Sequence, residues 1–240
     1  HEAVWISLSD KNKLIEKAKG LKHVHRKNLP LYGIPFSVKD NIDVAGLATT
    51  AACPSFSYTP KKSATVVEHL ERAGAICIGK TNMDQFATGL NGTRSPYGSC
   101  GSAFNPTMVA GGSSSGSAVS VALQQVCFSI GTDTGGSGRI PAGLNNIIGL
   151  KPTVGTLSSK GLVPCCPSLD CPSIFSLNIE DAIEIAQTAF KPDNLDPSLR
   201  YDSIRSTFNL SKIDKSFNVY IPKTNQLEFF GNEEGKLLYE

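Results

Sequence analysis

One lysine and two serines in glycine-rich surroundings are the residues of this chain whose types and spacing could do chemistry. Ser113 lies in the run Gly111–Ser117, Ser137 ends the run Gly131–Ser137, and Lys39 lies upstream of both. A lysine that is removed from water loses its charged form more easily and can act as a base near neutral pH. A serine next to such a base becomes a nucleophile. The three residues therefore predict acyl transfer by serine without a histidine.

The glycines before Ser137 add a second requirement of acyl transfer. Gly135 and Gly136 leave the backbone free to turn several N–H groups toward one point, where the oxyanion of a tetrahedral intermediate would sit. Each such donor contributes about 3 to 4 kcal/mol to transition-state stabilisation. Taken alone, the run that ends at Ser137 is also compatible with a turn that holds an incidental serine. Taken alone, Lys39 is also compatible with a surface lysine that pairs with Asp40. The combination of the three motifs favours the chemical interpretation.

Other nucleophile and ligand patterns fit the sequence less well. The run Gly111–Gly116 has the glycine spacing of a phosphate-binding P-loop, but Ser117 stands where that motif needs lysine. None of the four histidines is flanked by catalytic residue types, which argues against a Ser-His-Asp triad. The cysteines of the Cys165–Cys171 segment lack a second CxxC pair and a nearby histidine. We therefore expect no metal and no cofactor.

Composition and charge place the chain among ordinary globular proteins. Its 240 residues are 40% hydrophobic and 18% charged, with a formal net charge of +2, so one domain with a sizeable core is expected. This charge argues against nucleic acid as a partner, and the short basic cluster Lys19–Lys27 is interpreted as a solvated helix end. We see no apolar stretch long enough to cross a membrane. Seven scattered cysteines favour reduced thiols and a cytoplasmic location.

Helical and strand patterns alternate along the chain. One expected helix follows a cap at Ser9 or Asp10, and a second follows a cap at Ser63 and ends at Gly74. A single helical turn is expected from Asn82, and the ranges Gly116–Gln124 and Ile179–Phe190 are expected to be helices. The expected strands are Ile34–Val38, Ala75–Gly79, Val126–Ile130, Ile147–Leu150 and Phe217–Ile221. This alternation predicts an α/β fold with a mixed, mainly parallel sheet flanked by helices. Because the alternation continues to the last residue, we interpret residues 1–240 as a single domain that is incomplete at its C-terminus.

The three motifs resemble, in order and spacing, those of the amidase signature family, whose triad is Ser-cis-Ser-Lys. The resemblance extends from about Leu31 to Phe175 and implies that Ser137 is the nucleophile, Ser113 the bridging serine after a cis peptide bond, and Lys39 the base. It also implies an oxyanion hole, formed by the backbone amides of Thr134, Gly135, Gly136 and Ser137. One departure is Ser115, where many members carry glycine, and it leaves the triad intact. Family domains usually continue well beyond 240 residues.

Within this family, the segments Gly92–Gly98 and Gly155–Cys171 are most similar to allophanate hydrolases. The resemblance implies a small amide substrate, allophanate, that is split to ammonia and carbon dioxide during urea degradation. It also implies a fusion or association with a biotin-dependent urea carboxylase, and a homodimer. Arg94 is a candidate partner for the substrate carboxylate, although we expect most such partners beyond residue 240. Arg139 is expected to brace Asp133 instead.

Two alternatives remain open on the sequence. A glutamyl-tRNA(Gln) amidotransferase A-like protein would be a glutaminase that uses the same three motifs and passes ammonia to companion subunits. A catalytically silent scaffold within a larger urea-degrading protein is the third interpretation. The presence of Lys39, Ser113 and Ser137 together argues against the scaffold.

Overall fold

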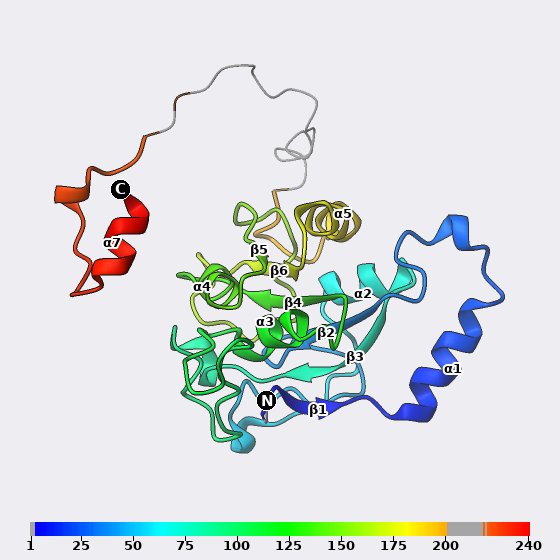
Figure 1. Ribbon diagram of the computed structural model, residues 1–240. Helices are drawn as coiled ribbons and strands as arrows, with labels where there is room; N and C mark the ends of the chain where they lie inside the picture. Colours follow the sequence, from blue (N-terminus) through cyan, green and yellow to red (C-terminus); the bar gives the residue numbers. More distant parts are fainter. Residues whose placement is uncertain (1–2, 201–217, 219) are drawn as a thin grey trace. The chain divides into compact units, whose positions relative to one another are not determined.

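The computed structural model describes residues 3–200, 218 and 220–240 (Figure 1). The chain divides into two compact units, His1–Thr207 and Phe208–Glu240. The first unit holds all three motifs that the sequence singles out. In the second unit, the described residues form a short 3-10 helix, Thr224–Gln226, and the helix α7, Glu233–Tyr239, which has no buried residue.

The first unit is built around one six-stranded sheet. Its strands are β1 Trp5–Leu8, β2 Pro35–Lys39, β3 Ile76–Thr81, β4 Phe128–Thr132, β5 Ile148–Leu150 and β6 Pro172–Ser176. They lie in the order β1-β3-β2-β4-β6-β5. The two pairings of β2, with β3 and β4, are parallel, and the β1–β3, β4–β6 and β5–β6 pairings are antiparallel. The predicted α/β fold with a mixed sheet is confirmed, but parallel pairing is confined to the centre of the sheet and does not predominate.

Helices connect and cover these strands. They are α1 Lys11–Leu21, α2 Thr65–Arg72, α3 Ser115–Ala122, α4 Arg139–Leu144 and α5 Ile179–Ala189. The side chain of Asp10 caps α1 by accepting a hydrogen bond from the Lys13 N–H, as predicted. The predicted cap at Ser63 is wrong, because its hydroxyl accepts instead from the backbone of Ala45 and α2 begins after Ala64.

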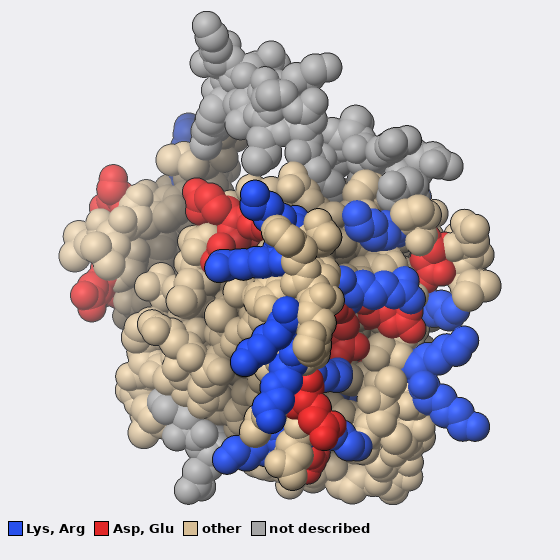
Figure 2. All heavy atoms as spheres, turned by 90° about the vertical axis from the view of Figure 1, so that its right-hand side faces the viewer, with Lys and Arg blue, Asp and Glu red and all other residues tan. Residues whose placement is uncertain are grey.

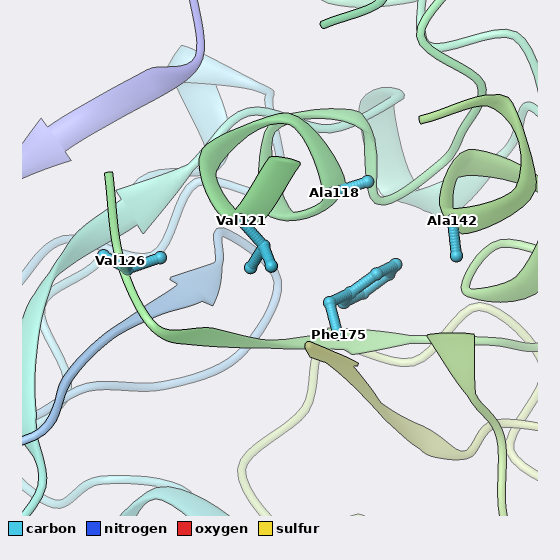
Figure 3. Packing of buried hydrophobic residues seen from close by; sticks show 5 residues of the cluster. All are labelled: Ala118, Val121, Val126, Ala142 and Phe175. Carbon is cyan, nitrogen blue, oxygen red and sulfur yellow. The ribbon is translucent and has the colours of Figure 1, made fainter. Parts of the chain in front are cut away.

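Helices α3 and α4 share one face of the sheet. Figure 3 shows Phe175 of β6 pointing toward Val121 and Ala118 of α3 and Ala142 of α4. These side chains are at most 2% exposed, and Val126 completes the cluster. Small residues on both helices let the backbones approach the ring closely. This packing fixes the first turn of α3, which carries the first serine motif, against the sheet.

The opposite face of the sheet carries large apolar side chains. Phe36 of β2 and Phe128 of β4 lie in register and stack with their ring centroids 5.0 Å apart. Helices α2 and α5 pack against each other, and the buried residues of α5 include Ile185 and Ala186. Because side chains alternate along a strand, Ser37 and Lys39 point away from the Phe36 side. The Ser37 hydroxyl indeed contacts Ser120 of α3, 3.0 Å away.

Several elements differ from the prediction. The strands β1 and β6 and the helix α4 were not predicted, and the expected turn from Asn82 is a short 3-10 helix at Gln85–Ala87. Helix α4 contains a proline and a glycine, and β6 begins with proline, so neither has the propensity of its structure. Phe217 and Val219 of the strand expected at Phe217–Ile221 lie outside the described residues. Tyr220 and Ile221 are described and belong to no strand.

The basic cluster on α1 and after it is a solvated surface, as interpreted from the sequence. All residues of Lys19–Lys27 except the half-buried Leu21 are exposed. Figure 2 shows the side of the molecule where α1 lies, and there Lys and Arg side chains are interspersed with acidic ones. Lys17 of α1, for example, pairs with Glu71 of α2 at 2.7 Å. Among the described residues, no helix is long and apolar enough to span a membrane.

Candidate active site

Lys39 lies at the C-terminal end of the central strand β2 and is fully buried. Its Nζ donates to Ser113 Oγ at 2.8 Å and to Thr132 Oγ1 at 2.7 Å. Burial lowers the pKa of Lys39 to about 7, and the carboxylates of Asp84, Asp133 and Asp170 oppose this shift. The amine is therefore held between two hydroxyls and can be neutral near physiological pH. Thr132 is the last residue of β4, which runs parallel to β2, and the sequence analysis did not identify it as a site residue.

Ser113 is brought to Lys39 by the close approach of α3 to the sheet. The peptide bond Gly112–Ser113 is cis, as the family resemblance implied. A Cβ on Gly131 of β4 would lie 2.7 Å from the ring of Phe175 and 2.9 Å from Ser114 Oγ. Only a glycine leaves room for the serine run against the strand. The Ser114 hydroxyl uses this proximity to donate to the Thr132 carbonyl oxygen at 3.0 Å.

Ser137 lies on the turn between β4 and α4 and is 2% exposed. Its carbonyl oxygen accepts a hydrogen bond from the Ser114 N–H at 3.2 Å, so the two serine motifs are in direct contact. Among the hydrogen bonds of the described residues, none joins the hydroxyls of Ser113 and Ser137. The structure thus brings Lys39 and Ser113 into hydrogen-bond contact and places Ser137 next to them through its backbone.

Asp133 holds this turn from its inner side. Its carboxylate accepts from the backbone N–H groups of Gly136, Gly138 and Arg139 at 2.8 to 3.1 Å. The Arg139 guanidinium adds two further bonds of 2.9 Å each, so the expected bracing of Asp133 is confirmed. Burial disfavours the charged carboxylate, but these hydrogen bonds outweigh it and lower the pKa of Asp133 to about 2.

The same contacts change the expected oxyanion hole. The Gly136 N–H is already engaged by Asp133 Oδ1 and is not free to bind a developing oxyanion. The N–H groups of Thr134, Gly135 and Ser137 make no hydrogen bond within the described part of the chain. A Cβ on Gly135 would meet nothing within 4 Å, so the backbone at Gly135 faces open space. Three of the four predicted amides remain available.

Asp84 is a buried carboxylate beside the cis peptide that the sequence analysis missed. It accepts from the N–H groups of Gly92 and Arg94 at 3.0 and 2.7 Å, and its own N–H donates to the Ser113 carbonyl oxygen. A Cβ on Gly112 would lie 2.1 Å from Asp84 Oδ2, which explains the glycine at that position. Arg94, the candidate carboxylate partner, is exposed and donates through Nη1 to the Thr88 carbonyl oxygen at 2.7 Å.

A second lysine is fully buried beside the first. Lys80 of β3 lies 3.3 Å from Asp40 Oδ1, and both side chains are inaccessible to solvent. Asp40 also accepts from the backbone of Thr50 and Ala52 and from the Thr50 hydroxyl. Burial lowers the pKa of Lys80, and Asp40 opposes this shift. Asp40 therefore pairs with Lys80 and not with Lys39, which leaves the amine of Lys39 for the serines.

Asp170, also missed from the sequence, contacts the turn from its outer side. Its Oδ1 accepts from Thr134 Oγ1 at 2.5 Å, and its carboxylate accepts from the N–H groups of Cys165 and Cys166 at 2.9 to 3.1 Å. The cysteines of this loop are free thiols. No group of three or more potential metal ligands is found in the described ranges.

Comparisons with known proteins agree with these observations. The chain matches the profile of the Amidase family over residues 1–231. It is 50% identical to urea amidolyase of Saccharomyces cerevisiae over 98% of its length, and 41% identical to a glutamyl-tRNA(Gln) amidotransferase subunit of Mycoplasma pneumoniae over 86%. Its structure superposes on allophanate hydrolase of Kluyveromyces lactis with a TM-score of 0.81 and 54% identity over 83% of the chain.

The chain spans only part of each of these proteins. It covers 13% of the yeast urea amidolyase, 43% of the bacterial amidotransferase chain and 33% of the Kluyveromyces lactis chain.

Proposed function

The chain belongs to the Amidase family, and from this premise we propose that Lys39, Ser113 and Ser137 form the triad of a serine amidohydrolase. The observation that carries the proposal is the hydrogen bond of 2.8 Å between Lys39 Nζ and Ser113 Oγ inside the protein. A lysine at the surface would be protonated at neutral pH and could not accept a proton. With its pKa lowered to about 7 by burial, Lys39 can serve as a base there.

In the proposed reaction, neutral Lys39 accepts the proton of Ser113 while Ser113 accepts that of Ser137. The Ser137 oxygen attacks the amide carbonyl carbon and forms a tetrahedral oxyanion. Collapse of this intermediate breaks the C–N bond, and the proton held on Lys39 returns through Ser113 to the leaving nitrogen, so ammonia departs. Water then attacks the Ser137 ester, its proton restores the Ser137 hydroxyl, and the acid leaves. The proton transfer requires a rotation that joins the hydroxyls of Ser113 and Ser137.

The amides of Thr134, Gly135 and Ser137 are the proposed oxyanion donors. They have no other partner in the described residues, whereas Gly136 donates to Asp133. Donors held in place before the reaction stabilise the oxyanion without reorganisation. Asp133 serves this arrangement indirectly, because it fixes the backbone at Gly136, Gly138 and Arg139.

The proposed substrate is allophanate, with ammonia and carbon dioxide as products. Support comes from the 50% identity to urea amidolyase of Saccharomyces cerevisiae and the 54% identity to allophanate hydrolase of Kluyveromyces lactis. We further propose that residues 1–240 are one part of a longer amidase domain, fused to or associated with a biotin-dependent urea carboxylase. A contact between Arg94 and the substrate carboxylate, a homodimer and a cytoplasmic location remain predictions.

A glutaminase of the amidotransferase type is the second candidate. The 41% identity to the glutamyl-tRNA(Gln) amidotransferase chain of Mycoplasma pneumoniae favours it, since that relative matches over 86% of the chain. The two functions require the same triad and differ in substrate.

Ammonia release distinguishes these candidates. We expect the protein, in its longest form, to release ammonia from allophanate and not from glutamine or a simple aliphatic amide. Ser137→Ala should abolish turnover, because it removes the oxygen that forms the proposed ester. The matched control is Ser7→Ala, which removes another buried serine hydroxyl, on β1, and should retain full activity. Near wild-type turnover by Ser137→Ala would refute the nucleophile assignment, and release from glutamine alone would favour the second candidate.

A further inference from the structure

The antiparallel pairing of β4 and β6 brings a buried carboxylate to the turn that follows β4. Thr132 pairs with Pro172 at the end of the ladder, and the Asp133 N–H donates to the Cys171 carbonyl oxygen at 2.8 Å. One step further along the same register, Thr134 meets Asp170. The residue after β4 and the residue before β6 are therefore neighbours as a direct consequence of strand pairing.

Asp170 links the turn after β4 to the loop that holds Cys165 and Cys166. It is 8% exposed, and its carboxylate binds the hydroxyl of Thr134 on one side and the N–H groups of Cys165 and Cys166 on the other. Burial raises the pKa of the Cys165 thiol, and the Lys39 charge and the Thr134 side chain oppose this shift. The loop that holds Cys165 is thus connected through Asp170 to the turn between β4 and α4.

The turn is held before Thr134 by the backbone bond from Asp133 to Cys171, and after Gly135 by the Asp133 carboxylate. Asp133 fixes Gly136, Gly138 and Arg139, which follow the proposed oxyanion donors, but it makes no bond to Thr134 or Gly135. In the described part of the chain, the Thr134 side chain is anchored by Asp170. Without this anchor, Thr134 and Gly135 would be held, among the described residues, only through the residues that flank them.

We propose that Asp170 is a positioning residue of the active site. Through Thr134 it fixes the first half of the oxyanion-binding turn, and through Cys165 and Cys166 it holds the adjoining loop beside the nucleophile. This inference rests on the proposed function, because it assigns Asp170 a role in the reaction of Ser137. Its charge also acts on the base, since Asp170 is one of the carboxylates that favour the protonated form of Lys39.

Three variants separate the anchor from the charge. Thr134→Val removes the hydroxyl bond to Asp170 and keeps the shape of the side chain, whereas Thr134→Ser keeps the hydroxyl. Asp170→Asn removes the charge and replaces one of the two acceptor oxygens with an NH2 group, which cannot accept a hydrogen bond from Cys165 or Cys166. The matched control is Asp196→Asn, because Asp196 is also 8% exposed and also accepts from backbone N–H groups, those of Ser159 in a neighbouring loop and Ser198 in its own loop.

The experiment measures the rate at which a fluorophosphonate labels Ser137 in the longest form of the protein, followed by mass spectrometry. In this step the Ser137 oxygen bonds to phosphorus, fluoride leaves and the serine proton passes to the base. We expect Asp170→Asn and Thr134→Val to slow labelling about 10- to 100-fold, with effects that are not additive, and Thr134→Ser to restore it. Asp196→Asn should label at the wild-type rate.

The pH dependence supplies a readout that a purely structural role would not move. Loss of the Asp170 charge should shift the midpoint of the rate of labelling toward lower pH, because less negative charge near Lys39 lowers its pKa further. Wild-type labelling rates in Asp170→Asn, or a loss of rate equal to that in Asp196→Asn, would overturn the inference. Absence of Ser137 labelling in the wild-type protein would instead overturn the proposed function.

Discussion

At the residue scale, burial of Lys39 predicts a specific pH dependence. The pKa of Lys39 is lowered to about 7, and the reaction needs its neutral form, so kcat/KM should fall about tenfold per pH unit well below pH 7 and level off above it. The measurement is the pH profile of ammonia release from allophanate. Removing a remote carboxylate by Asp181→Asn should leave the midpoint unchanged, since within the described residues its side chain accepts a hydrogen bond from Asn178, at the start of α5, and from no other side chain. A midpoint near 10 would mean that Lys39 is solvated and is not the base.

The same burial makes stability depend on pH. The pKa of Lys39 is lower in the folded state than in the unfolded chain, so the unfolded chain binds more protons between about pH 7 and 10. Stability from this residue therefore rises with pH across that window. Burial of Lys39 thus lowers the stability of the fold near neutral pH, and the proposed role of this amine as a base accounts for its burial. The pairing of Lys80 with Asp40 keeps the neighbouring buried charge compensated.

At the element scale, the glycine of β4 determines how closely α3 approaches the sheet. Gly131→Ala would place a methyl group 2.7 Å from Phe175 and 2.9 Å from Ser114, both fully buried, so α3 must shift. Overpacking of this kind costs about 1 to 3 kcal/mol, and we expect such a loss in the free energy of unfolding by urea. The matched control is Gly143→Ala in α4, where the new methyl group meets nothing within 4 Å. It should keep or raise stability, by up to about 1 kcal/mol. Equal effects of the two substitutions would contradict this interpretation.

Elements also explain why the sequence predicted one part of the site and missed another. Lys39 and Ser113 could be identified because their chemistry lies in local motifs, and their 2.8 Å contact confirms the pairing. Asp170 could not be identified, because its contact with Thr134 depends on the antiparallel pairing of β4 with β6. Strand β6 begins with proline and carries buried serines, so it lacks the alternation of apolar and polar residues that would predict a strand. Similarly, the sequence predicted that the Gly136 N–H would bind the oxyanion, but in the folded turn this N–H donates to Asp133.

At the scale of the whole molecule, apolar side chains beside the site are left exposed. Leu90, whose carbonyl oxygen accepts from the Gly112 N–H, is 43% exposed, and Leu144 beside Gly111 is 47% exposed. Both flank the motifs that carry the proposed nucleophile and bridging serine. A contiguous exposed apolar patch marks a site of contact with further protein, and Leu90 and Leu144 are the candidates for such a patch beside the site. We therefore expect the longer amidase domain of the proposed function to cover them.

This expectation is tested by comparing residues 1–240 with a chain extended to the length of the amidase domain. The shorter chain should bind more of a hydrophobic dye such as ANS and should label Ser137 more slowly with a fluorophosphonate, because part of the pocket is missing. Leu90→Ser and Leu144→Ser should lower dye binding in the shorter chain and destabilise only the extended one, where these side chains become buried. Equal dye binding and equal labelling rates in the two chains would show that residues 1–240 already form the complete site, and the proposed extension would then be wrong.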